Sequence, residues 1–326
     1  MQSIKCSVEK YPLANAFRIS RGSKTEAIVV VASVTSGGVT GYGECLPYAR
    51  YDETPESVCK QINSIYSGNG TDLNRHALQD NLTAGAARNA LDCALIDLEA
   101  KQRGIRAWDI FGIERPVPCV TAYTLSLDQP EKMASNARTH QNRGLLKLKL
   151  GPDNAVDCVR EVRKQAPNSE LIVDANEAWS MSQLDGSIED FAACNVTMVE
   201  QPLPAASDDA LTGQKFPIPI GADESAHTSE ELDSLAEKYQ VINIKLDKTG
   251  GVTEAIRMLD RAQELNLDCM IGCMIATSLS MAPAMLLTTR ARFVDLDGPL
   301  LLAKDRYPGM LYTNDKIHSP NKELWG

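Results

Sequence analysis

Short apolar runs alternate with segments of helical periodicity through the middle of the chain. Each run has about four β-favouring residues followed by a charged one, and runs of that length between helical segments indicate βα units. Repeated βα units predict a parallel sheet. The runs read LLKLKL (145–150), LIVDAN (171–176), VTMVEQP (196–202), IPIGADES (218–225) and VINIKLDK (241–248).

One charged residue of each run falls where its strand should end. Lys149, Asp174, Glu200, Asp223 and Lys245 follow one another at intervals of 22 to 26 residues. A βα unit occupies roughly 30 residues or slightly fewer, so these positions suit successive strands of a (β/α)8-type barrel. Because such barrels carry their active sites at the carboxyl ends of the strands, we expect the five side chains to point into one mouth.

The first third of the chain has a different pattern. Residues 2–10 and 26–46 alternate weakly between apolar and polar positions around an SGG turn, which predicts a three-stranded antiparallel meander. Apolar residues then recur at helical spacing over 87–98, with Thr83 placed to cap the start of the helix and Gly104 near its end. The pattern therefore predicts an α+β unit ahead of the barrel.

The segment ERPVPCV (114–120) contains two prolines and marks the expected domain boundary, because boundaries fall in such linkers. We predict an N-terminal α+β domain over residues 1–115 and a barrel over residues 116–326. The chain has 326 residues in all. A barrel takes about 250 residues or fewer, so the two units fit this length.

Composition narrows the class of protein. A net charge of −10 and a pI near 5.0 disfavour nucleic acid or an anionic membrane as a partner. The sequence has neither a long apolar run nor the apolar core of a signal peptide, so we expect a cytoplasmic protein without a membrane span. Nine cysteines, an odd number, then indicate reduced thiols, and the four histidines have no zinc-type spacing to Cys269 and Cys273.

The three acidic strand ends predict a metal site. Carboxylates that converge repel one another and raise one another's pKa, so Asp174, Glu200 and Asp223 need a compensating cation. Oxygen ligands suit Mg²⁺, with Mn²⁺ as a substitute. A lysine close to a dication can have its pKa lowered toward neutrality and accept a proton, so Lys149 and Lys245 are candidate acid/base catalysts.

This arrangement suits proton transfer at a carbon next to a carboxylate. The metal would hold the substrate carboxylate and stabilise the enediolate that forms when the α-proton leaves. One lysine would take that proton, and the other would return a proton to the opposite face.

The motifs around these residues resemble the enolase superfamily. Lys147 and Lys149 on one strand, with a lone Lys245 on the sixth strand, are similar to its muconate-lactonizing subgroup. The strings VDAN, VEQP, ADES, NIKLDKTGG and DLDGP resemble dipeptide epimerases of the L-Ala-D/L-Glu epimerase type, and the resemblance spans nearly the whole chain.

The resemblance implies a modified (β/α)7β barrel with an N-terminal capping domain, against which the C-terminal tail packs. It implies that the three carboxylates bind one Mg²⁺ per subunit and that Lys149 and Lys245 are the acid/base catalysts, with Lys147 in a supporting role at the substrate. The implied reaction is epimerisation at the α-carbon of the C-terminal residue of a dipeptide, L-Ala-L-Glu or L-Ala-D-Glu, during reuse of cell-wall peptides.

Other charges fit the two ends of such a substrate. Asp295 and Asp297 are two residues apart and so share one face of a strand, where they would accept an ammonium group; a helix cap or a turn acid is the alternative interpretation. The basic segment FRISRGSKTEA carries Arg18, Arg21 and Lys24. It is either a solvated turn or a mobile lid that offers cations to a substrate anion. The resemblance favours the lid, with Arg21 and Lys24 ahead of Arg18.

Three further positions keep two interpretations each. Glu224 either orients a metal ligand or Lys245, or it caps the helix expected at Ser229. Met274 and Ile275 either shape the pocket wall or pack in the core.

Other functions also remain open. A cycloisomerase or an o-succinylbenzoate synthase of the same superfamily would use the same metal and lysines but would have no use for an ammonium site. A Schiff-base aldolase or lyase would need one barrel lysine and no metal. A non-catalytic binding barrel would need none of the five charged strand ends. The sequence leaves the oligomeric state open, a homo-oligomer included.

Overall fold

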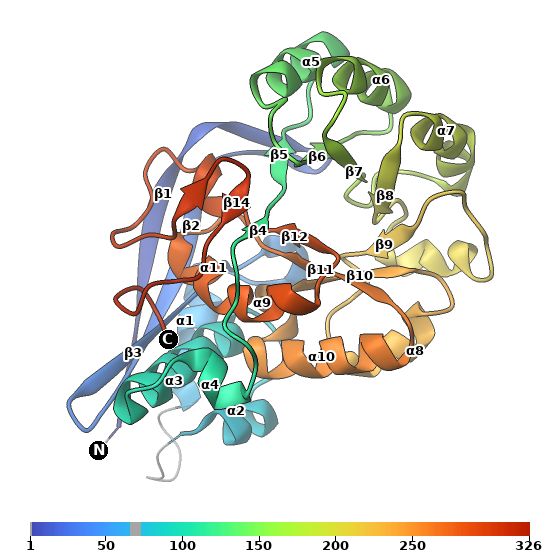
Figure 1. The fold of residues 1–326 in the computed structure, drawn as a ribbon. Helices are drawn as coiled ribbons and strands as arrows, with labels where there is room; N and C mark the ends of the chain where they lie inside the picture. The colour runs from blue at the N-terminus through green and yellow to red at the C-terminus, as the bar shows by residue number, and fades with distance from the viewer. Residues whose placement is uncertain (1, 66–72) are drawn as a thin grey trace.

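The computed structural model describes residues 2–65 and 73–326, and Figure 1 shows their arrangement. In this part of the chain the N-terminal region forms an antiparallel sheet in the order β1-β2-β3, which confirms the predicted meander. Its elements and the helices that follow are β1 (Ser3–Ile19), β2 (Gly22–Ser36), β3 (Val39–Cys45), η1 (Ala49–Tyr51), α1 (Pro55–Ile65), α2 (Arg75–Asn81), α3 (Ala86–Arg103) and α4 (Ala107–Phe111).

The first two strands are longer than the pattern predicted. They pair as far as Ile19 and Gly22, so Arg18 and Lys24 lie within strands and the turn between them contains Arg21. The basic segment is therefore the tip of a β-hairpin rather than an open loop. In Figure 1 this tip reaches over to the barrel, where Leu127 N donates to Arg18 O at 3.1 Å.

Helix α3 lies directly on β3 because two glycines remove the side chains that would separate them. A Cβ at Gly41 would lie 2.1 Å from Ala94 O, and a Cβ at Gly43 would lie 2.1 Å from Ala90 O. Any larger residue at these two positions would force the helix away from the sheet.

The ends of the helices differ from the predicted caps. The predicted cap Thr83 is wrong by two positions, because α3 has Gly85 as its N-cap and the N–H of Ala86 donates instead to Glu53 Oε1 at 2.7 Å. A carboxylate from a separate loop thus takes over the capping role. The end at Gly104 is confirmed, with this residue in the left-handed conformation that favours glycine.

In the described residues the second sheet has eight strands, all parallel, in the order β5 to β12. A hydrogen bond of 2.8 Å from Ala122 N to Val294 O joins the two ends of the sheet. The five predicted runs coincide with β6 to β10, and the prediction of a capped (β/α)8-type barrel is confirmed. The strands are β5 (Tyr123–Leu125), β6 (Leu145–Lys149), β7 (Glu170–Asp174), β8 (Val196–Glu200), β9 (Ile220–Ala222), β10 (Val241–Lys245), β11 (Asp268–Gly272) and β12 (Phe293–Asp295).

The crossovers between these strands are unequal. Long helices follow β5, β6, β7 and β10, whereas 3-10 turns and one short helix follow β8 and β9. No helix in the described ranges is long and apolar enough to cross a membrane. The crossover elements are α5 (Pro130–Thr139), α6 (Ala155–Gln165), α7 (Met181–Ala193), η2 (Ala205–Leu211), η3 (Ser229–Glu231), α8 (Leu232–Leu235), α9 (Leu246–Thr249), α10 (Val252–Glu264), α11 (Ser278–Ala284), η4 (Met285–Arg290) and η5 (Gly298–Leu301).

The barrel interior has an apolar floor and a charged top. Side chains alternate between the two faces of a strand. On β6, Lys147 and Lys149 therefore point into the same interior as Leu145, and on β7 Asp174 follows Ile172 in the same way. Because residues two apart share a face, the charged residues at the strand ends also point into the barrel mouth. The floor consists of Ala122, Leu145, Ile172, Met198, Val241, Met270 and Phe293.

The C-terminal residues return to the N-terminal helices. The short strand β13 (Tyr312–Thr313) pairs with β14 (Lys316–Ile317), which in turn pairs with β4 (Cys119–Val120). Beyond them, Trp325 Nε1 donates to Cys93 O of α3 at 3.0 Å. The chain thus crosses twice between the two regions, and the boundary between residues 115 and 116 stays a prediction.

Candidate active site

Three buried carboxylates meet at the carboxyl ends of neighbouring strands. Asp174 ends β7, Glu200 ends β8, and Asp223 directly follows β9. The register pairs Asp174 with Glu200 and Glu200 with Gly221, so Asp223 lies two residues beyond the partner of Glu200. One oxygen from each carboxylate lies within 4.8 Å of the other two. The structure therefore brings together the triad that the sequence predicted.

Lysines surround this triad. Lys149 Nζ lies 2.5 Å from Asp174 Oδ2, and Lys245 Nζ lies 2.6 Å from Asp223 Oδ2. Lys149 ends β6 and Lys245 ends β10, four strands further round the eight that the structure describes. The two amines therefore approach the carboxylates from opposite sides of the barrel.

Lys147 lies deeper, between the acids. Its Nζ is 2.7 Å from Glu200 Oε2, 3.3 Å from Asp174 Oδ2 and 2.9 Å from Asp295 Oδ2. Burial alone would lower the pKa of Lys147, but the carboxylates of Asp295, Glu200 and Asp174 raise it well above its usual value. Lys147 is thus a fixed positive charge below the triad.

The other oxygen of each carboxylate is held by a different group. Asp174 Oδ1 accepts from Asn176 N at 2.8 Å, and Glu200 Oε1 accepts from Asn243 Nδ2 at 2.7 Å. Asp223 Oδ1 lies 2.7 Å from the buried Nζ of Lys248. Each carboxylate thus has one oxygen fixed from outside, while its second oxygen faces the interior of the site.

The triad has the electrostatics of a cation site. Burial and the charge of Asp174 raise the pKa of Glu200 to about 7. Burial would lower the pKa of Lys245, but Asp223 with Glu200 and Glu224 holds it well above its usual value. This direction is opposite to the lowered lysine pKa expected from the sequence, because here Asp223 is the direct partner of the ammonium. A cation that takes the carboxylates would free Lys245 to lose its proton.

The residues present fit a hard divalent cation. The three atoms of the triad that face one another are carboxylate oxygens, the ligand type that Mg²⁺ and Mn²⁺ prefer. Their outer oxygens are held by hydrogen bonds, the arrangement that orients metal ligands in proteins. Asp174, Glu200 and Asp223 could therefore hold one Mg²⁺.

Sequence reasoning missed the groups that hold the outer oxygens. Asn243 stands two residues before Lys245 on β10 and so shares its interior face, which is a signal that could have found it. Its side chain has room because β11 ends in Gly272, where a Cβ would lie 2.3 Å from Asn243 Oδ1. Lys248 gives no such signal, because it belongs to the short helix α9.

The predicted ammonium site lies at the end of β12. Asp295 Oδ2 pairs with Lys147, while Asp295 Oδ1 is buried and has no hydrogen-bond partner among the described residues. Asp297 Oδ2 accepts from Thr124 N at 2.6 Å. Burial and Asp295 raise the pKa of Asp297 to about 7. Both carboxylates line the same cavity as Asp223, Lys149 and Lys245.

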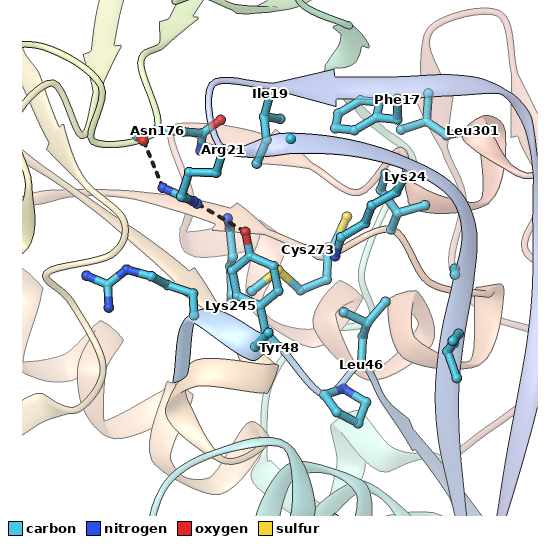
Figure 2. Close-up of a pocket in the computed structure, with 18 of the residues that line it drawn as sticks. Phe17, Ile19, Arg21, Lys24, Leu46, Tyr48, Asn176, Lys245, Cys273 and Leu301 are labelled. Atoms are coloured by element: carbon cyan, nitrogen blue, oxygen red, sulfur yellow. Dashed lines mark hydrogen bonds between the residues drawn. The ribbon is translucent and has the colours of Figure 1, made fainter. Parts of the chain in front are cut away.

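The two candidate cations of the hairpin, Arg21 and Lys24, have different surroundings. Arg21 lies 2.6 Å from Glu224 Oε1 and 3.1 Å from Glu177 Oε2, and it donates to Asn176 O at 2.8 Å, as Figure 2 shows in part. Lys24 extends into the cavity, where its Nζ lies 4.7 Å from the centre of the Tyr48 ring. In the described ranges no carboxylate pairs with Lys24, and burial together with Arg21 lowers its pKa. Lys24 is therefore the more available of the two cations.

The structure bears on the alternatives that the sequence left open for Glu224, Met274 and Ile275. Thr228 and Glu231 form the capping box of the turn at Ser229, so Glu224 is not the cap. Its buried carboxylate instead accepts from Arg21. Met274 and Ile275 both line the cavity. Sequence reasoning left these alternatives open. The structure rules out the capping role of Glu224, whereas Met274 and Ile275 line the cavity and also pack against the core.

The cavity lies between the two regions of the chain and measures about 860 Å³. The hairpin tip and the segment from Leu46 to Pro55 form one side, and the strand ends of the barrel form the other (Figure 2). Its walls thus carry Asp223 of the triad, the flanking lysines, the acids of β12 and Lys24.

Comparisons with known proteins agree with this architecture. The model of the mandelate racemase/muconate lactonizing enzyme N-terminal domain matches residues 2–112, and the enolase C-terminal domain-like model matches residues 132–314. The L-Ala-D/L-Glu epimerase of Escherichia coli is 43% identical over 320 residues, which cover 98% of this chain and 100% of that protein. An N-acetyl-D-glutamate racemase of Pseudoalteromonas is 41% identical over 300 residues, covering 91% and 95%.

A solved structure extends the likeness to three dimensions. It is an enolase family member from Agrobacterium tumefaciens with homology to dipeptide epimerases, with bound sodium, L-Ala-L-Glu and an ordered loop. The two folds superpose with a TM-score of 0.94 at 43% identity, covering 100% of both chains. With both domain models matched and these relatives aligned over almost its whole length, the chain belongs to the enolase superfamily, in its mandelate racemase/muconate lactonizing enzyme family.

Proposed function

We propose that the protein is a Mg²⁺-dependent dipeptide epimerase, which moves a proton from and to the α-carbon of the C-terminal residue of L-Ala-L-Glu or L-Ala-D-Glu. The observation that carries this proposal is the pair of lysines, Lys149 and Lys245, on opposite sides of a buried carboxylate triad. Inversion at a carbon needs a proton acceptor on one face and a donor on the other, and this pair supplies both.

Asp174, Glu200 and Asp223 would hold the cation, and Mn²⁺ should replace Mg²⁺ because the two share a preference for oxygen ligands. When bound, the cation supplies positive charge to the substrate carboxylate, which makes the neighbouring α-proton more acidic. The chain's own residues move that proton: one strand-end lysine accepts it, and the other donates a proton to the opposite face.

The remaining charges select the substrate. Asp295 and Asp297 accept the ammonium group of the N-terminal alanine, and Lys24 takes the distal carboxylate of the glutamate. The ammonium site argues against a cycloisomerase or an o-succinylbenzoate synthase, whose substrates carry no such group. The carboxylate triad argues against a Schiff-base lyase and against a binding barrel without catalysis.

A second candidate is racemisation of an N-acylated glutamate. It is favoured by the 41% identity to an N-acetyl-D-glutamate racemase and by the ion pair between Lys147 and Asp295, which offsets part of the negative charge that an ammonium group would need. The dipeptide carries a charged ammonium group where N-acylated glutamate carries a neutral amide. The contribution of Asp297 to substrate binding therefore distinguishes the two candidates.

The cellular role follows from the proposed substrate. The protein would act in the cytoplasm on small dipeptides released from the cell wall, with no nucleic acid or membrane partner. A homo-oligomer is compatible with this role.

Proton NMR of L-Ala-L-Glu in D₂O tests the proposed function. With the protein and Mg²⁺ we expect the glutamate α-proton signal to disappear and the second diastereomer to grow, and EDTA should stop both changes. Exchange on N-acetylglutamate, with none on the dipeptide, would favour the second candidate. No exchange on either substrate would contradict the proposal.

A further inference from the structure

Two arginines of the N-terminal region converge on one carboxylate of the barrel. Arg50 binds Glu177 through two parallel hydrogen bonds, Nε to Oε2 at 2.9 Å and Nη2 to Oε1 at 3.0 Å. Arg21 adds a contact of 3.1 Å to Oε2. The side chain of Glu177 is only 8% exposed, against 40% for Arg50. Paired bonds between charged groups are strong and fix the mutual geometry of the partners, so this cluster fastens the hairpin and η1 to the barrel.

Glu177 belongs to a turn with an unusual backbone. Asn176 has φ 47° and Glu177 has φ 67°, a left-handed region that residues other than glycine rarely adopt. Such a backbone persists only where its surroundings hold it. Here Arg21 donates to Asn176 O at 2.8 Å, Glu177 N donates to Gln201 O at 2.9 Å, and Ala205 N donates to Glu177 Oε1 at 2.9 Å. One of these contacts comes from the hairpin.

The same turn also holds a member of the triad. Asn176 N donates to Asp174 Oδ1 at 2.8 Å, the bond that fixes the outer oxygen of that carboxylate. The hairpin thus contacts the turn on one side, and the turn contacts Asp174 on the other. A change in the backbone at 176 and 177 would alter both contacts at once.

We propose that Glu177 is a positioning residue that couples docking of the hairpin to the orientation of Asp174. While Arg21 and Arg50 hold Glu177, the turn keeps its left-handed backbone and the N–H of Asn176 stays on Asp174. When the arginines leave, the turn relaxes and this bond weakens. Coupling between two sites is reciprocal, so a cation at the triad tightens the hairpin and a docked hairpin raises the affinity for the cation.

The chain offers a matched control on the same hairpin. Arg18 reaches the barrel through Asp128, with Nη1 3.1 Å from Oδ2, and its side chain is 50% exposed. Exposed pairs contribute little, and this one does not touch the turn at 176 and 177. Arg18→Gln therefore removes an arginine from the hairpin without removing the proposed coupling.

The first test measures the hairpin in protein treated with EDTA. Hydrogen exchange of residues 17–27, followed by mass spectrometry, should become about tenfold faster in Glu177→Gln, because both arginines lose a charged partner. Arg18→Gln should stay within about twofold of the unmodified protein. Unchanged exchange in Glu177→Gln would overturn the proposal.

The second test measures the cation by calorimetry with Mg²⁺. We expect Glu177→Gln to weaken Mg²⁺ binding about tenfold, the size of effect seen when groups that orient metal ligands are lost, and Arg18→Gln to leave it unchanged. A loosened hairpin with unaltered Mg²⁺ affinity would overturn the coupling. Arg50→Gln, which leaves the barrel sequence intact, should change both quantities in the same direction and keeps the test valid if Glu177→Gln does not fold.

The double variant Arg50→Gln/Glu177→Gln shows whether the two substitutions act through the same cluster or independently of each other. Its exchange and its Mg²⁺ affinity should match those of Glu177→Gln alone, because both substitutions break the same cluster. Additive losses would contradict the proposal. The inference rests on the proposed metal site but not on the substrate. Both readouts are made without a dipeptide, so failure of the epimerase proposal would leave them interpretable.

Discussion

At the scale of single residues, each carboxylate of the triad divides its two oxygens between two tasks. One oxygen faces the interior of the site, and a neighbour holds the other. The inward-facing residues could be predicted from the sequence, because each ends an apolar run or directly follows it. The neighbours could not: an asparagine inside a strand and a lysine in a short helix have many ordinary roles. Asn243 becomes significant only when the register sets Lys245 opposite Gly272.

Asn243→Ala tests the importance of these neighbours. The substitution removes the donor to Glu200 Oε1, so we expect Mg²⁺ affinity to fall about tenfold while the fold stays intact. Calorimetry with Mg²⁺ measures the affinity, and circular dichroism checks the fold. An affinity equal to that of the unmodified protein would show that Glu200 needs no such support.

A second residue-scale prediction concerns pH. Burial and Asp295 raise the pKa of Asp297 to about 7, so the carboxyl group becomes protonated as the pH falls through that value. Protonation removes the negative charge that the proposed ammonium site needs. The kcat/KM for L-Ala-L-Glu should therefore fall below about pH 7, by up to tenfold per pH unit.

The control for this profile is Asp297→Asn, since Glu200 also has a pKa near 7. The variant should have a lower kcat/KM for the dipeptide at pH 8 and a shallower acidic limb. For N-acetylglutamate, which lacks the ammonium group, the substitution should change little. An identical acidic limb in the variant would assign it to another group.

At the scale of elements, periodicity predicted the strands better than the connections. Each run ending in a charge became a strand, because short and mostly apolar runs between helical segments are typical of the buried strands of a parallel sheet. The turns after β8 and β9 lack long helices, and the basic segment became a hairpin because its strands pair to the tip. Such features depend on partners far away in the sequence. Glu53, for example, replaces the predicted cap Thr83 from a separate loop.

The junction between α9 and the N-terminal elements gives an element-scale prediction. Asp247 Oδ1 is buried and accepts from Leu46 N at 3.0 Å and from Asn89 Nδ2 at 2.8 Å. Burial raises its pKa from 3.8 to about 7. The folded state thus binds more protons than the unfolded state between these values, and this residue lowers the stability as the pH rises through that window.

Asp247→Asn should remove this dependence, because its amide oxygen can accept both hydrogen bonds without a charge. We expect the variant to be more stable than the unmodified protein by about 1 to 3 kcal/mol at pH 8, and nearly equal at pH 4. Urea unfolding at the two pH values measures the difference. A loss of stability at pH 8 would show that the charged form is the favoured one.

At the scale of the whole molecule, the cavity needs both regions of the chain. The barrel supplies Asp223 of the triad and the lysines, while the hairpin and the loop near Tyr48 close the other side (Figure 2). The sequence predicted which residues the barrel contributes, since parallel strands direct their ends to one face. It could not predict that Arg21 is held by Glu224 and Glu177, because ion pairs between distant segments follow from the docking of the two regions.

The central claim is that two lysines on opposite sides of the barrel exchange protons with opposite faces of one α-carbon. Lys149→Arg and Lys245→Arg should both abolish epimerisation, because each removes one of the two acid/base groups. Each variant should still exchange the α-proton of one diastereomer with solvent, since one lysine remains to remove it.

The most direct measurement follows α-proton exchange by NMR in D₂O, with L-Ala-L-Glu and L-Ala-D-Glu supplied separately to each variant. The account predicts that one variant exchanges only the L-Glu diastereomer and the other only the D-Glu diastereomer, with no interconversion in either. Exchange of both diastereomers by one variant, or epimerisation without one of the lysines, would contradict it.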